Sequence, residues 1–95
     1  MRKYEVMLIL PAEADESVVS GAVDRITKVV GESGGEVGKV DRWGRRRLAF
    51  EIAKQTEGYY VVVDVTADPA SMKELDRVLT LADDVIRFKA LVRAA

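Results

Sequence analysis

The sequence contains no cysteine and no histidine. Without cysteine, the chain can form neither disulfide bonds nor thiolate metal sites. Without histidine, it lacks the side chain that most often acts as a general base near neutral pH and as a metal ligand. These absences argue against metal-dependent and acid–base enzymes, so we expect no catalytic residue, no metal ion and no cofactor.

Long apolar runs and an excess of one charge are also missing. No apolar run approaches the roughly 20 residues that a membrane-spanning helix needs, and the first residues lack the apolar core of a signal peptide. We therefore expect a cytoplasmic protein with no membrane partner. The 15 basic and 16 acidic side chains leave a net charge of −1, so any nucleic-acid binding must come from a local basic patch.

The remaining composition is that of a globular protein. The 95 residues are 48% hydrophobic and 33% charged, which is ordinary for a folded chain of this kind. A chain of this length has no room for a second independent core. We expect one domain that covers residues 1–95.

The apolar pattern predicts six elements in the order β-α-β-β-α-β. Period-two alternation predicts strands at residues 3–10, 36–52, 59–66 and 85–92. Spacings of three and four predict helices over residues 16–30 and from Pro69 to about residue 82, with Asp15 and Asp68 as N-caps. Residues 54–58 are predicted to form a hairpin loop, and Asp83 and Asp84 a turn.

This order predicts an α+β fold of the ferredoxin-like, split β-α-β type. Two right-handed crossovers joined by a hairpin give a four-stranded antiparallel sheet, in the order 4-1-3-2, with both helices on one face. The other face is then open, and it is either a solvated mixed surface or a docking surface. The alternation places on it Lys3, Glu5, Met7 and Ile9, then Tyr60, Val62 and Asp64, then Arg87, Lys89 and Leu91.

Positive charge is concentrated in the segment 40–50, where four arginines lie within six positions: Arg42, Arg45, Arg46 and Arg47. The apolar alternation changes parity across Gly44, which predicts a β-bulge that bends the strand. Beyond the bulge, extended backbone should send Arg46 to the face opposite Arg45 and Arg47, unless the bulge redirects one of them.

Two readings fit these arginines. Guanidinium groups match the paired oxygens of phosphate, but charge on an edge strand also prevents unwanted strand pairing. The neighbouring Trp43 could stack on a base, cover an apolar side chain of a partner, or pack under the bend, and tryptophan is enriched at protein interfaces. Reading of single-stranded RNA across the sheet is not expected, because Tyr60 is the one aromatic on the central strands of the open face, with Glu5 and Asp64 beside it.

Three stretches of the sequence resemble protein six of the bacterial small ribosomal subunit: MRKYEV at residues 1–6, VDRWGRRRLAFEIAK at residues 40–54 and EGYY at residues 57–60. The resemblance implies a ferredoxin-like fold and no catalysis. It also implies binding to the central domain of 16S ribosomal RNA as a heterodimer with small-subunit ribosomal protein eighteen, in support of subunit assembly and translation. Phe50 stands where tyrosine is usual. The chain stops at Ala95, so we expect fewer contacts from the polar tail that family members often carry.

The resemblance and the charge pattern together supply two sets of candidate site residues. The candidates for contact with RNA are Arg2, Lys3, Arg45, Arg46, Arg47, Arg87, Lys89 and Arg93. The candidates for a protein interface, or for packing at the bulge, are Trp43, Leu48, Phe50 and Tyr60.

Two other functions are compatible with the same fold. A homodimeric ligand-sensing module would need a pocket with converging polar groups, and the sequence shows neither a glycine-rich loop nor an acidic cluster at a strand end. A small hydrolase would need a phosphate-binding loop after the first strand, where Glu13 and Asp15 would instead repel the substrate. We therefore expect no small-molecule substrate.

Overall fold

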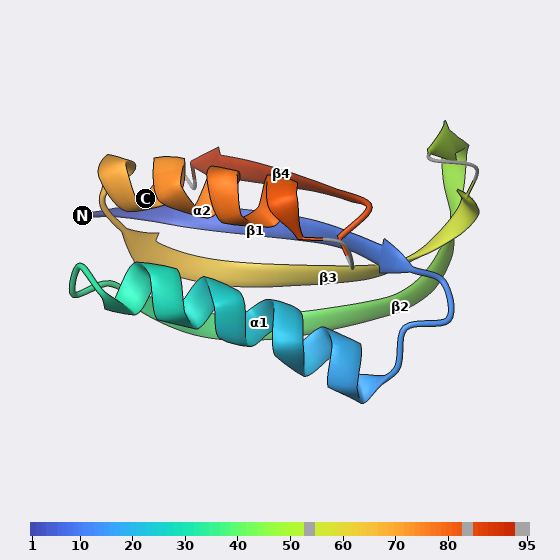
Figure 1. Cartoon of the computed structure of the whole chain (residues 1–95), viewed down its shortest axis with the longest axis horizontal. Helices are drawn as coiled ribbons and strands as arrows, with labels where there is room; N and C mark the ends of the chain where they lie inside the picture. The colour runs from blue at the N-terminus through green and yellow to red at the C-terminus, as the bar shows by residue number, and fades with distance from the viewer. Residues whose placement is uncertain (53–54, 83–84, 93–95) are drawn as a thin grey trace.

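The computed structural model describes residues 1–52, 55–82 and 85–92, with side chains for all of these except 49–52 and 55. The elements follow the predicted order (Figure 1). The strands are β1 (Arg2–Pro11), β2 (Glu36–Ile52), β3 (Gln55–Ala67) and β4 (Arg87–Val92), and the helices are α1 (Glu16–Gly31) and α2 (Pro69–Leu81).

The four strands form one antiparallel sheet in the order β2-β3-β1-β4. Both helices lie against the same face of this sheet, and within the described ranges no helix covers the opposite face (Figure 1). The α+β ferredoxin-like fold and the strand order predicted from the sequence are therefore confirmed. Because β2 and β4 are the edge strands, the basic segment of β2 lies at one side of the sheet.

Aspartate caps begin both helices, as predicted. The Asp15 side chain accepts a hydrogen bond from the Val18 N–H at 3.1 Å, and Asp68 accepts one from the Ser71 N–H at 2.8 Å. The second bond lowers the pKa of the Asp68 carboxyl. The ionised cap therefore stabilises α2 above the ordinary pKa of an aspartate, and this contribution is lost as the pH falls through the lowered value.

The core lies between the sheet and the two helices. The central strands β1 and β3 supply most of the sheet's share, because alternate residues on each point toward the helices. The core residues are Val6, Leu8 and Leu10 from β1, Val61, Val63, Val65 and Ala67 from β3, Val19, Ala22, Ile26 and Val30 from α1, and Leu75 and Leu79 from α2. Burial of each large side chain in this core contributes about 1.5–3 kcal/mol to the free energy of unfolding. Valine has a low helix propensity, so α1 depends on this packing.

Neither helix in the described ranges is long and apolar enough to span a bilayer.

The predicted hairpin loop at residues 54–58 is wrong for its last four positions. Residues 55–58 belong to β3, and Gly58 is paired with both Arg46 and Pro11. Glycine is needed there because a Cβ atom would lie 2.5 Å from Cγ2 of Ile9. Gly58 therefore reflects close packing and not a turn. Residues 53 and 54 lie outside the described residues.

The last strand is also shorter than predicted. It begins at Arg87 instead of residue 85, although the Ile86 N–H already donates to the Ile9 carbonyl at 2.8 Å. Residues 85 and 86 thus lead into the strand from α2. The turn predicted at Asp83 and Asp84 lies outside the described residues.

Two glycines provide a matched test of the fold. A Cβ atom at Gly35 would lie 2.4 Å from the Thr66 carbonyl oxygen and 2.9 Å from that of Val30, whereas a Cβ atom at Gly21 would meet nothing within 4 Å. We expect Gly35→Ala to lower the free energy of unfolding by at least about 1–3 kcal/mol, because backbone atoms must move apart. Gly21→Ala, inside α1, should raise it by about 0.5–1 kcal/mol. Urea denaturation measures both, and a Gly35→Ala protein as stable as the unmodified chain would contradict the packing described here.

Candidate nucleic-acid interface

A β-bulge interrupts β2 at the centre of the basic segment. Arg42 lies across from Val61 and Gly44 lies across from the preceding residue of β3, Tyr60, so Trp43 is an extra residue in β2. Gly44 has a φ of +83°, in the left-handed region that favours glycine. The bulge predicted from the change of parity at Gly44 is therefore confirmed.

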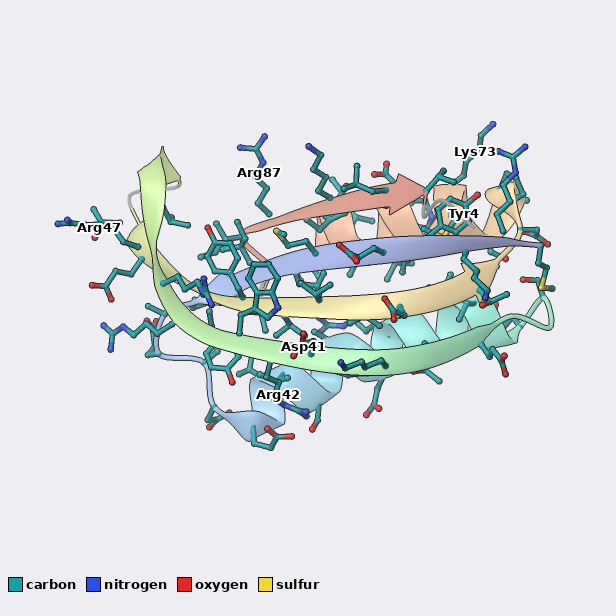
Figure 2. All side chains as sticks on the ribbon, turned by 180° about the vertical axis from the view of Figure 1, so that it is seen from behind. Tyr4, Asp41, Arg42, Arg47, Lys73 and Arg87 are labelled. Atoms are coloured by element: carbon teal, nitrogen blue, oxygen red, sulfur yellow. The ribbon has the colours of Figure 1, made fainter. Side chains whose placement is uncertain are left out.

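Beyond the pair of Arg46 and Gly58, β2 and β3 continue as a two-stranded hairpin past the end of β1. The last pair between β1 and β3 is Pro11 with Gly58, while β2 and β3 remain paired as far as Ile52 and Gln55. This part curls away from the rest of the sheet (Figure 1), and Arg47 projects outward from it (Figure 2). We call residues 45–52 and 55–57 the basic arm.

The arginines of the basic arm are divided between its two faces. Arg45 lies across from Tyr59, Arg46 across from Gly58, and Arg47 across from Glu57, so Arg46 points away from the other two. This is the alternation that the extended backbone predicted. On the face shared by Arg45 and Arg47, the Arg45 Nε donates to Glu57 Oε2 at 2.5 Å.

Arg42, which precedes the bulge, points toward the helical layer. Its Nη2 donates to Oε1 of Glu16, at the start of α1, at 2.6 Å. Both side chains are partly exposed to solvent, and an exposed pair of this kind contributes about 0.2–1 kcal/mol. Arg42 is therefore directed toward a carboxylate of its own chain.

Arg46 lies over an exposed aromatic surface on the open face of the sheet. Its Cζ is 4.9 Å from the ring centroid of Trp43, and the Trp43 ring is parallel to that of Tyr60 within 8°, with the centroids 6.4 Å apart. The Trp43 Nε1 also donates to Asp41 Oδ2 at 3.3 Å. Trp43 nevertheless remains 41% exposed. We call Trp43, Tyr60 and Arg46 the Trp43 platform.

The sheet beside the Trp43 platform is already closed by apolar side chains of this chain. Ile9, Val62 and Leu48 are 8%, 7% and 6% exposed. Leu48 is therefore placed as a packing residue and presents little surface to a partner. The side chain of Phe50 lies outside the described side chains.

A shallow depression of about 230 Å³ adjoins Trp43 on the same face. It is lined by Glu5, Lys39, Asp41, Trp43, Val62 and Asp64. Three carboxylates and one ammonium group give this surface a negative balance, which is unfavourable for phosphate. Sequence reasoning did not single out Asp41, although its position two residues before Trp43 on an extended strand was the available signal.

The other basic candidates fall into two groups. Arg87 and Lys89 of β4 lie across from Ile9 and Met7, on the open face that the alternation predicted. Arg87 projects from β4 near the end of the sheet that carries the basic arm (Figure 2). Arg2 and Lys3 lie at the opposite end of β1, where Lys3 is paired with Thr66. Arg93 lies outside the described residues.

Comparison with known proteins gives a consistent result. The family model described as "Ribosomal protein S6" matches residues 3–91. Small ribosomal subunit protein bS6 of Saccharopolyspora erythraea is 53% identical over 93 residues, which cover 98% of this chain and 79% of that protein. The protein of the same name from Mycobacterium tuberculosis is 52% identical over 91 residues, which cover 96% of this chain and 95% of that protein.

Solved structures agree with this match. The crystal structure of 30S ribosomal protein S6 from Thermotoga maritima superposes with a TM-score of 0.84 at 32% identity, covering 97% of this chain and 87% of that one. The C-terminal domain of the MgtC protein from Mycobacterium tuberculosis superposes with a TM-score of 0.63 at 12% identity. The second likeness shows the fold alone.

The bulge can be tested through Gly44. We expect Gly44→Val to lower the free energy of unfolding by about 1–2 kcal/mol, because a β-branched residue does not tolerate the left-handed backbone. It should also shift the emission of Trp43, the one tryptophan of the chain. Gly44→Asn is the control, since asparagine enters this region more readily, and it should retain most of the stability and the emission spectrum. Equal behaviour of the two variants would contradict the bulge.

Proposed function

This chain belongs to the ribosomal protein S6 family, and we propose that it binds the central domain of 16S ribosomal RNA as a heterodimer with small-subunit ribosomal protein eighteen. As a member of this family it is a structural protein of the small ribosomal subunit and not an enzyme. It therefore acts in the ribosome, in the cytoplasm.

The overall charge supports a shared mode of RNA binding. At a net charge of −1, the chain does not attract RNA through a general excess of positive charge. Its affinity must come from a few local contacts. Each phosphate that is neutralised adds only about 0.7–0.9 to the magnitude of the salt slope, which is the slope of log binding constant against log salt concentration. A partner that adds its own basic surface supplies the rest.

We assign the main RNA contact of the basic arm to Arg47. Arg42 and Arg45 are directed toward carboxylates, and Arg46 lies on Trp43. Arg47 makes no hydrogen bond or ion pair with any side chain that the structure describes, and it projects outward (Figure 2). Its guanidinium fork suits the paired oxygens of phosphate. Arg87 and Lys89 lie on the open face with the Trp43 platform, so we do not assign them to this RNA surface.

We assign the Trp43 platform to the protein partner. An exposed tryptophan that is held flat by its neighbours is typical of the residues that dominate protein interfaces. The carboxylates of Glu5, Asp41 and Asp64 beside it disfavour RNA and favour a basic segment of protein. Tyr60 supports Trp43 from the neighbouring strand, and Leu48 packs beside it without direct contact to the partner.

The observation that carries this proposal is the separation of the two surfaces by the bulge. Arg45 and Arg47 occupy one face of the basic arm, and Arg46 lies on the other face, over Trp43. One hairpin can therefore contact RNA and protein at the same time without competition between the two.

Arg47→Ala tests the RNA contact. In the heterodimer with protein eighteen, we expect weaker binding to the central-domain RNA and a salt slope smaller by about 0.7–0.9, because one phosphate contact is lost. Filter binding or fluorescence anisotropy over a series of salt concentrations measures both quantities. Arg77→Ala removes the same charge from α2, where Arg77 is paired with Glu74 at 2.5 Å, and it should leave the slope unchanged. Identical slopes for Arg47→Ala and the unmodified heterodimer would remove Arg47 from the RNA surface.

A further inference from the structure

Glu57 shares one face of the basic arm with Arg45 and Arg47. It is directly across from Arg47 in the register of β2 and β3, and its Oε2 accepts the hydrogen bond from Arg45 Nε at 2.5 Å. The side chains of Arg45 and Glu57 are 66% and 44% exposed. The ion pair therefore stands in solvent, on the face that we assign to RNA.

An exposed pair of this kind contributes little to the stability of the fold. Its electrostatic effect is larger, because the Glu57 carboxylate, bonded to Arg45 and across from Arg47, offsets one unit of positive charge where RNA would approach. A phosphate that binds Arg45 must also displace Glu57, since carboxylate and phosphate oxygens use the same donors of the guanidinium group. Arg47, across the strands, has no such occupant among the described side chains.

We propose that Glu57 is a specificity-determining residue that limits the affinity of the basic arm for RNA in general. This inference rests on the proposed function. By occupying Arg45, Glu57 leaves Arg47 as the principal phosphate contact, so an RNA binds well only if it places a phosphate there. A phosphate that approaches Arg45 instead meets the negative charge of Glu57. Repulsive elements of this kind are used by specific interfaces.

Glu57→Gln tests the proposal with little change in shape. Glutamine has nearly the same size as glutamate, and its amide oxygen can still accept from Arg45, so the hairpin should keep its geometry. With an unrelated RNA hairpin at about 0.1 M salt, we expect binding about three- to tenfold tighter than that of the unmodified heterodimer. The salt slope should be steeper by about 0.7–0.9, because a neutral amide holds Arg45 less strongly than a carboxylate does and a phosphate can displace it. The gain on the central-domain RNA should be smaller, so discrimination between the two RNAs should fall.

Glu74→Gln is the matched control. It removes the same charge from an ion pair on α2, where the hydrogen bond from Arg77 lowers the pKa of Glu74. A general effect of net charge would appear equally in both variants, whereas the proposal predicts a clear gain for Glu57→Gln alone.

The outcomes separate this inference from the function on which it rests. If Arg47→Ala weakens binding and Glu57→Gln behaves as Glu74→Gln does, the role of Glu57 is overturned and the RNA surface stands. If Arg47→Ala has no effect, the RNA surface itself fails, and the role of Glu57 fails with it. Unchanged discrimination between the two RNAs in Glu57→Gln would also overturn the proposal.

Discussion

The left-handed backbone of Gly44 is the constraint on which the interface depends. Trp43 is an extra residue there, so residues 45–48 of β2 face the side opposite to the one that an uninterrupted strand would give them. Without the bulge, Arg45 and Arg47 would share the face of Trp43, and Leu48 would face away from Ile9. With the bulge, Leu48 is buried beside Ile9, and the two arginines lie on the opposite face of the arm.

Packing on the open face supports this arrangement. The sequence allowed two readings of that face, a solvated mixed surface or a docking surface, and the structure combines elements of both. Ile9, Val62 and Leu48 are largely covered by neighbours of the same chain, while charged side chains surround them. Beside them the aromatic surface of Trp43 remains exposed, with Arg46 over its ring, and Leu91 of β4 is also exposed on this face.

The topology could be predicted from the sequence because alternation and helical spacing are local properties. The bulge was also predictable, since the change of parity at Gly44 is visible in the chain. Gly58 misled the prediction, because a glycine needed for close packing against Ile9 has the same local signature as a turn glycine. The ion pairs of Arg42 with Glu16 and of Arg45 with Glu57 could not be predicted, since they depend on the strand register and on how the strands curve.

The central claim is that one hairpin carries two separate surfaces, and titration of protein eighteen in the absence of RNA tests it most directly. Calorimetry should show that Trp43→Ala loses at least about 2 kcal/mol of binding free energy, as an interface hot spot does. Arg47→Ala, on the other face, should bind protein eighteen as the unmodified chain does. Equal losses in the two variants, or no loss in Trp43→Ala, would contradict the separation of the two surfaces.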